Sequence, residues 1–144
     1  MRIVIITQNE PFYLVKSLKY LIENFPYHSK IVGCVVANPS PFGKKESFLK
    51  KAFKTYKIFG LKFFIRFSIK FMLTLFDPNN SLKLLLKKNK IDIIEIDKNI
   101  NSSYSLSKIK SYQPDILISI LGNQLFKKPL IDLAPNGCLN LHSA

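Results

Sequence analysis

Five short apolar runs divide the chain, and each is rich in branched aliphatic residues. They cover residues 3–6, 31–36, 91–96, 116–120 and 138–141. Three of the runs are nearly continuous rather than alternating, which is typical of strands buried on both faces of a parallel sheet. We therefore predict a strand at each run.

The segments between these runs predict helices. Apolar residues recur at helical spacing over residues 12–25, 81–88 and 125–133, and residues 103–111 form a shorter, more polar candidate. Pro129 must lie near the first turn of the last helix, because it would break the helix further along. Strands that alternate with helices predict a doubly wound α/β domain with a mostly parallel, Rossmann-like sheet.

Ligands of such sheets bind beyond the carboxyl ends of the strands. The segments at the carboxyl ends of the predicted strands are 7–11, 37–43, 121–124 and 140–144. We expect the functional residues in these segments.

Residues 44–76 differ from the rest of the chain because they are long, basic and aromatic. One helical stripe comprises Phe48, Ala52, Tyr56, Phe59, Phe63 and Phe67, and Gly60 is placed to kink or divide the helix. We interpret the segment as a helical insertion packed against the sheet, since aromatic stripes more often lie in a core or domain interface. The alternative is an amphipathic helix on an anionic membrane surface, because its polar face is almost entirely cationic.

The net charge of +13 is concentrated in one region. Residues 44–90 hold 13 of the 22 Lys and Arg residues but only two acids, Glu46 and Asp77. This excess invites a nucleic-acid or membrane partner, yet no recognisable nucleic-acid-binding module is present. We therefore favour lysines that solvate the outer faces of helices.

The remaining composition indicates a globular, cytoplasmic protein. Hydrophobic residues make up 47% of the chain, which is enough for a core, and we expect Cys34 and Cys138 to be small buried hydrophobes. No Cys or His spacing predicts a metal site. The N-terminus does not resemble a signal peptide, and no uncharged apolar stretch of ~18 residues predicts a membrane span.

The last predicted strand carries the strongest candidate for chemistry. Residues two apart on a strand share a face, so Asn140 and His142 are expected to project together, while Leu139 and Leu141 face the core. An amide N–H and an imidazole N–H that converge on one oxygen can stabilise the oxyanion of an acyl transfer. His142 is also suited to handling the proton of an attacking amine.

The sequence around this pair resembles the formyltransferase family. Its pattern is Pro114-Asp115, an apolar strand, a loop, a helix, and then Gly137 followed by Asn140 and His142-Ser143. The resemblance is specific over residues 113–143 and weaker but collinear over residues 1–112. It implies that 10-formyltetrahydrofolate is the cofactor, that Asn140 and His142 are catalytic, and that residues 121–126 bind the folate. That loop comprises Leu121, Gly122, Asn123, Gln124, Leu125 and Phe126, of which Leu125 and Phe126 would provide apolar walls unless they simply pack a helix on the sheet.

The sequence departs from the family's pattern beyond His142. The family's catalytic aspartate and its leu-pro-x-x-arg-gly loop follow the histidine, and this sequence ends at Ala144. We therefore expect residues 1–144 to be the N-terminal, truncated part of a formyltransferase domain, with a sheet incomplete at its C-terminus. Such a chain is expected to be prone to aggregation and inactive alone.

The loop after the first strand and the 44–76 segment bear on the formyl acceptor. The absence of a glycine-rich phosphate loop after residue 7 argues against a glycinamide ribonucleotide acceptor, and the basic, aromatic segment is more like the nucleotide-sugar enzymes. An amino-sugar nucleotide is the favoured acceptor, with tRNA second. Two other classes stay open: a non-catalytic basic α/β module that binds anionic membrane or nucleic acid, and a plain nucleotide-binding domain, although no Gly-x-Gly-x-x-Gly or Walker motif is present.

Overall fold

The computed structural model describes residues 1–37, 47–122 and 124–141. The strands are β1 (Arg2–Gln8), β2 (Lys30–Ala37), β3 (Asp92–Ile94), β4 (Ile116–Ile120) and β5 (Cys138–Leu141). The helices are α1 (Leu14–Glu23), α2 (Phe48–Phe76), α3 (Leu82–Lys88), α4 (Ser103–Lys110) and α5 (Lys128–Ile131). Each predicted strand is present, although β3 is shorter than the apolar run that predicted it.

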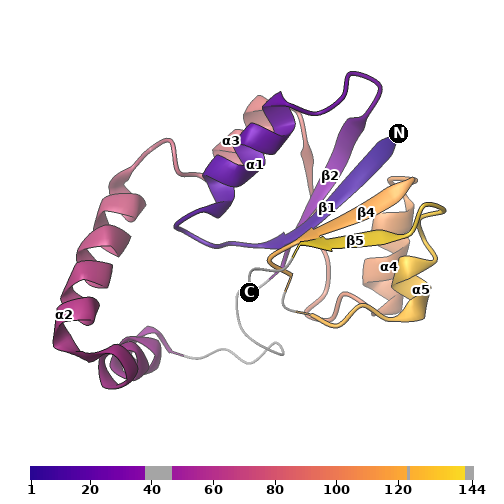
Figure 1. The fold of residues 1–144 in the computed structure, drawn as a ribbon. Coiled ribbons are helices and arrows are strands. Elements are labelled where there is room, and N and C mark those ends of the chain that lie inside the picture. Colours follow the sequence, from indigo (N-terminus) through magenta and orange to yellow (C-terminus); the bar gives the residue numbers. More distant parts are fainter. Residues whose placement is uncertain (38–46, 123, 142–144) are drawn as a thin grey trace.

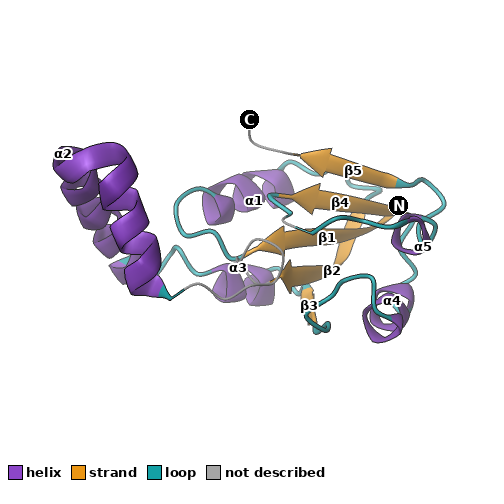
Figure 2. Cartoon of the chain, turned by 90° about the horizontal axis from the view of Figure 1, so that it is seen from below, coloured by secondary structure: helices purple, strands orange, loops and turns teal. Residues whose placement is uncertain are grey.

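The five strands form one parallel sheet in the order β3-β2-β1-β4-β5 (Figures 1 and 2). The predicted doubly wound, Rossmann-like α/β fold is therefore confirmed. The chain first builds the sheet outward from β1 through β2 to β3, and then crosses to the other side of β1 to add β4 and β5. The strand order thus reverses between β1 and β4, which is where ligands bind in open sheets of this class.

Helices cover both faces of the sheet. Alternate residues of β1 supply the two cores: Ile3 and Ile5 pack with α1 and α3, whereas Val4 and Ile6 pack with α4 and α5. Figure 1 shows these two pairs of helices on opposite sides of the strands. All four β1 side chains are at most 1% exposed, which explains why the run is continuous rather than alternating.

Serine side chains begin three of the helices. Ser47, Ser81 and Ser102 each accept a hydrogen bond from the backbone N–H three residues later, at the starts of α2, α3 and α4. The predicted helix over 125–133 is only the short α5, and Pro129 lies in its first turn, as that prediction required. It begins late because the loop before it is hydrogen-bonded to Asn101.

The edge strand β5 corrects one expectation. Leu139 and Leu141 do not face the core, since they are 56% and 57% exposed. Leu139 pairs with Ile118, on the face where α1 and α3 pack mainly over β1 and β2. Because α5 lies on the opposite face, no described helix covers this side of β5. The alternation of side chains along the strand was predicted correctly, but the burial of Leu139 and Leu141 was not.

The helix α2 is present as predicted, but it does not pack against the sheet. It divides at Gly60, where φ is 79° and ψ is 173°, a left-handed conformation that glycine adopts readily. Figures 1 and 2 show α2 standing apart from the strands. Its ring contacts with the rest of the described chain are made to Phe12, in the loop between β1 and α1. The interpretation of this segment as a helix packed on the sheet is therefore wrong.

Candidate functional site

A cavity of about 700 Å³ lies where the strand order reverses. It collects side chains from three places that are far apart in the sequence: the loop and first turns after β1, the end of β4, and β5. Its walls are partly polar and partly apolar, as is common for small-molecule sites. The lining residues are Glu10, Tyr13, Leu14, Ser17, Ile120, Leu121, Asn140 and Leu141.

Glu10 fixes the wall that follows β1. Its carboxylate accepts hydrogen bonds from the backbone N–H groups of Phe12 and Tyr13, both at 2.8 Å, and from that of Leu14 at 3.1 Å. These are N–H groups that the start of α1 would otherwise leave without partners. The negative charge of the Glu10 carboxylate also interacts favourably with the positive, N-terminal end of the α1 dipole. The loop between β1 and α1 is therefore held in one arrangement by a residue that lines the cavity.

Leu121 forms the turn at the end of β4. Its φ of 57° lies in the left-handed region, which is uncommon for a residue other than glycine and recurs at functional sites. Its N–H donates to the carbonyl of Leu141 at 3.2 Å, so the turn also fastens the end of β5. Gly122 follows because a Cβ there would overlap Ser119 Oγ. The glycine is required by close packing, while Leu121 makes the turn.

Asn140 lies at the carboxyl end of β5 and lines the cavity. It is paired in register with Ser119 of β4 and is exposed to solvent. His142 and Asn123, which were predicted to act beside it, lie outside the described residues. The convergence of Asn140 and His142 on one oxygen therefore stays a prediction.

The side chain of Gln124 joins the loop after β4 to the loop after β3. Its Oε1 accepts from the N–H of Ile100 at 2.9 Å, and its Nε2 donates to the carbonyl of Lys98 at 3.1 Å. Both of its functional groups are thus used within the protein. A direct role for Gln124 in binding folate stays a prediction, and the position has a structural reason of its own.

Asn101 completes this connection, and sequence reasoning did not identify it. Its Nδ2 donates to the carbonyl of Leu125 and its Oδ1 accepts from the N–H of Lys127, both at 2.9 Å. A single amide therefore replaces the backbone pairing that the loop lacks. The available signal was the polar turn 99–102, which follows a predicted strand and contains the residue types that commonly bond to the backbone of loops.

Leu125 and Phe126 differ in their surroundings. Leu125 is 81% exposed, whereas Phe126 packs against the core beneath α4 and α5. Neither residue lines the cavity where the strand order reverses. Their expected role as apolar walls for a folate stays a prediction, and the packing alternative describes Phe126 well.

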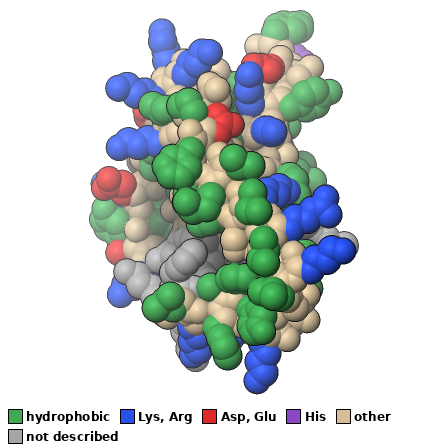
Figure 3. All heavy atoms as spheres, turned by 90° about the vertical axis from the view of Figure 1, so that its left-hand side faces the viewer, with side chains coloured by type: hydrophobic (Ala, Val, Ile, Leu, Met, Phe, Trp, Pro, Cys, Tyr) green, Lys and Arg blue, Asp and Glu red, His purple; other side chains and the backbone are tan. Residues whose placement is uncertain are grey.

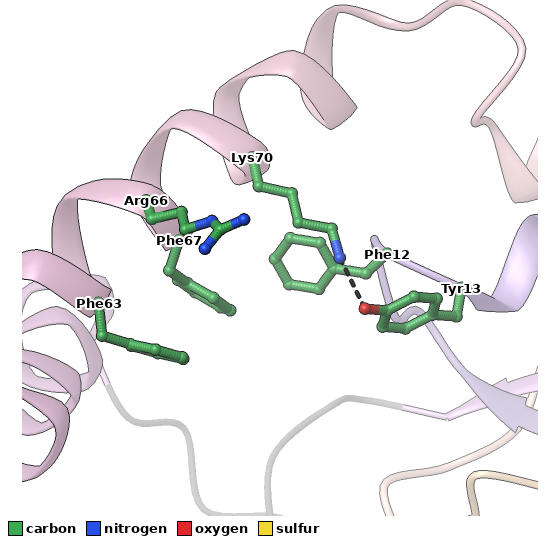
Figure 4. A pocket seen from close by; sticks show the side chains of 6 residues that line it. All are labelled: Phe12, Tyr13, Phe63, Arg66, Phe67 and Lys70. Atoms are coloured by element: carbon green, nitrogen blue, oxygen red, sulfur yellow. Dashed lines mark hydrogen bonds between the residues drawn. The ribbon is translucent and has the colours of Figure 1, made fainter.

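A second cavity of about 390 Å³ lies between α2 and the loop after β1. Lys70 donates to the hydroxyl of Tyr13 at 2.6 Å, and its ammonium lies 4.4 Å from the centre of that ring (Figure 4). Phe12 lies with its ring centre 4.9 Å from that of Phe67. Tyr13 borders both cavities, so α2 is attached to the same loop that forms one wall of the candidate site.

The titratable groups near the sheet are not arranged as a metal centre. In the described part of the chain, no three His, Cys, Asp or Glu side chains come together as metal ligands. Burial raises the pKa of the Cys34 thiol to about 12, as expected for a cysteine inside the core. Cys138 is only half-buried, and burial raises its pKa as well.

Comparison with known proteins gives one relevant similarity. No protein-family model matches the sequence. Methionyl-tRNA formyltransferase from Borrelia turicatae (strain 91E135) is 28% identical over 78 residues. This chain is similar to part of a formyltransferase. The match covers 49% of this chain and 25% of the relative, so the chain spans about a quarter of the length of that protein.

The similarity supports a formyltransferase-like relationship. It gives no support to an amino-sugar nucleotide as the acceptor. Among the helices that the structure describes, none combines the length and apolar character needed to cross a bilayer.

Proposed function

We propose that this chain belongs to a protein that transfers a formyl group from 10-formyltetrahydrofolate to an amine, and that the cavity where the strand order reverses holds the reacting groups. The observation that carries the proposal is the position of Asn140 in that cavity, at the carboxyl end of a strand. The similarity to a formyltransferase points to the same chemistry.

The cavity suits a folate derivative in size and lining. Its volume of about 700 Å³ falls in the range of small-molecule sites. Ile120, Leu121 and Leu141 offer apolar contact to a planar ring, and Glu10 and Tyr13 offer polar groups at the rim. When bound, 10-formyltetrahydrofolate would supply the formyl group that an amine attacks.

Asn140 would stabilise the charge that develops in this attack. Its Nδ2 can donate a hydrogen bond to an oxygen that gains negative charge as the amine adds to the carbonyl carbon. An amide is suited to this role because it is neutral and remains a donor at every physiological pH. We propose that His142 assists it and accepts a proton from the amine, because an imidazole can exchange a proton near neutral pH.

The acceptor is the finer part of the proposal. The relative's name makes methionyl-tRNA the first acceptor to test. An amino-sugar nucleotide is the second, on the basis of the sequence resemblance alone. The net charge of +13 suits either acceptor, because both carry phosphate.

Binding of a stable formyl-folate to the 144-residue chain tests the site before any acceptor is known. Isothermal titration should give saturable binding, and Ser17→Trp, which fills the cavity from the surface of α1, should abolish it. The matched control is Lys16→Trp, an exposed neighbour outside the cavity lining, which should bind as the unmodified chain does. Saturable binding that survives Ser17→Trp would place the folate elsewhere, and no binding at all would overturn the proposal.

Transfer is tested separately, in the longer protein to which we propose this chain belongs, with 10-formyltetrahydrofolate and each acceptor in turn, by mass spectrometry of the product. Asn140→Ala should lower the rate by about 10²–10³-fold while folate affinity changes little, since the amide acts mainly on the transition state. An equal loss of affinity and rate would instead make Asn140 a binding residue.

A further inference from the structure

The outward side of α2 carries an unusual combination of exposed apolar and cationic side chains. Beyond Gly60, residues at spacings of three and four form one stripe, each member at least half exposed. We call this the outer stripe; it comprises Leu61, Ile65, Ile69, Met72 and Phe76. Isolated exposed apolar residues are common, but a continuous set marks an interaction surface.

The rest of this half-helix shows that the outer stripe is not simply a badly packed core. Other side chains of the same helix make its contacts within the chain: the Phe67 ring lies 4.9 Å from that of Phe12, and the Phe64 ring lies 6.1 Å from that of Tyr56. The inward side is therefore already engaged by Phe12 and by the first half of α2. The outer stripe points away from both.

Cationic side chains border the outer stripe. Lys62 and Arg66 lie four residues apart in a row beside it, and the next cation in that row, Lys70, donates to the hydroxyl of Tyr13. Seven Lys and Arg residues lie within α2, and the helix contains no Asp or Glu. Figure 3 views this side of the molecule and shows hydrophobic side chains across much of it, with Lys and Arg side chains mostly near the edges.

We propose that α2 docks this protein on the surface of an anionic lipid bilayer. The outer stripe would enter the boundary between headgroups and acyl chains, and Lys62 and Arg66 would reach lipid phosphates through their long, flexible side chains. The two halves of α2, residues 48–59 and 61–76, are each shorter than the ~20 residues that span a bilayer, so they would lie along its surface. This inference does not depend on formyl transfer.

Charge favours a bilayer over a second copy of the chain. Pairing two outer stripes would bring two helices together that each hold seven cations and no acid. A nucleic acid would satisfy the cations but would leave the apolar stripe exposed. An anionic bilayer satisfies both parts of the surface at once.

Flotation of the 144-residue chain with lipid vesicles tests the proposal, because bound protein floats while aggregates sediment. The chain should float with vesicles containing one-third phosphatidylglycerol. Its affinity for pure phosphatidylcholine should be at least about tenfold lower, and added salt should weaken the anionic case.

Two pairs of substitutions separate the two halves of the interaction. Ile65→Asn with Ile69→Asn removes apolar contact, and Lys62→Glu with Arg66→Glu reverses charge; each pair should lower affinity for anionic vesicles at least about tenfold. The matched controls are Tyr20→Asn with Leu84→Asn, which are exposed apolar sites on α1 and α3, and Lys83→Glu with Lys87→Glu on α3. Both controls should float normally, and circular dichroism should show that all four variants are folded.

Four results would overturn the proposal. One is equal binding to neutral and anionic vesicles, and a second is no binding to either. Another is tight RNA binding without flotation. In that case Lys62→Glu with Arg66→Glu would abolish RNA binding, and Ile65→Asn with Ile69→Asn would leave it unchanged. The last is a dimer in sedimentation analysis, again without flotation, that Ile65→Asn with Ile69→Asn dissociates.

Discussion

The strand β1 and the helix α2 are both rich in large apolar side chains, yet one is the centre of the molecule and the other is largely exposed. Ile3, Val4 and Ile5 of β1 are fully buried, whereas Ile65 and Ile69 of α2 are 50% and 57% exposed. The strand is flanked by a strand on each edge and covered by two helices on each face. The helix has apolar residues around most of its circumference, but its ring contacts with the rest of the described chain are made to one loop. Apolar content alone therefore does not predict burial; the number of partners does.

The largest expected difference is in the effect of truncating one isoleucine in each region. Ile5→Ala should reduce the free energy of unfolding by about 2–5 kcal/mol, because it leaves a cavity between β1 and α1. Ile65→Ala should change it by less than about 0.5 kcal/mol, because the side chain has little contact to lose. Urea denaturation followed by circular dichroism measures both. Equal costs at the two sites would show that α2 is part of the same packed unit as the sheet.

A second test concerns how loops are attached to the sheet. Asn101→Ala should cost about 1–2 kcal/mol in the same measurement, because it removes the partners of the Leu125 carbonyl and the Lys127 N–H. Asn136→Ala, in the exposed turn before β5, is the control and should change stability little. Comparable losses from the two variants would mean that water replaces the Asn101 bonds at no cost.

A third test uses the pH dependence of the core. The pKa of Cys34 is raised from 9.0 to about 12, so the folded protein keeps this proton where the unfolded chain releases it. The resulting stabilisation is complete below pH 9 and is lost between pH 9 and 12, by about 1.4 kcal/mol per pH unit. Cys34→Ala should lack this contribution, so its stability should fall less steeply than that of the unmodified chain across the same range. Parallel curves would show that the thiol ionises without unfolding.

The smallest expected effect is the coupling between the two regions. A double-mutant cycle of Phe12→Ala and Phe67→Ala should give an interaction energy of about 0.5–1.5 kcal/mol, because these rings lie 4.9 Å apart. Amide hydrogen exchange in α2 should report this interaction energy more sensitively than denaturation of the whole chain. Additive effects would show that α2 does not rest on the β1–α1 loop in solution.

Much of the sheet could be predicted from the sequence, because each strand is a local apolar run. The kink at Gly60 could be predicted too, since glycine conformation depends on neighbouring residues. The exposure of Leu139 and Leu141 could not, because it depends on which strands α1 and α3 cover. The same limit explains why the exposed position of α2 was missed.

The candidate site divides in the same way. Asn140 and Leu121 were identified from sequence and do line the cavity, because the carboxyl ends of strands are predictable places. Glu10 lies in the predicted segment 7–11 but was not singled out, and Asn101 was missed, because the importance of both lies in backbone groups that only the folded chain brings to them. The positive φ of Leu121 has no signal in a leucine residue.

The central position of β1 has a consequence for synthesis on the ribosome. On one edge of β1, the partner strand β2 follows after about 30 residues. On the other edge, the N–H of Arg2 gains its partner, the carboxylate of Asp115, only 113 residues later. At ~5–20 residues per second, that edge stays unpaired for roughly 6–20 s after it emerges. The apolar α2 is translated during this interval. The strand most deeply buried in the finished protein is thus the one whose edge is open longest while the chain is being made, and the demand for a chaperone should be greatest before β4 appears.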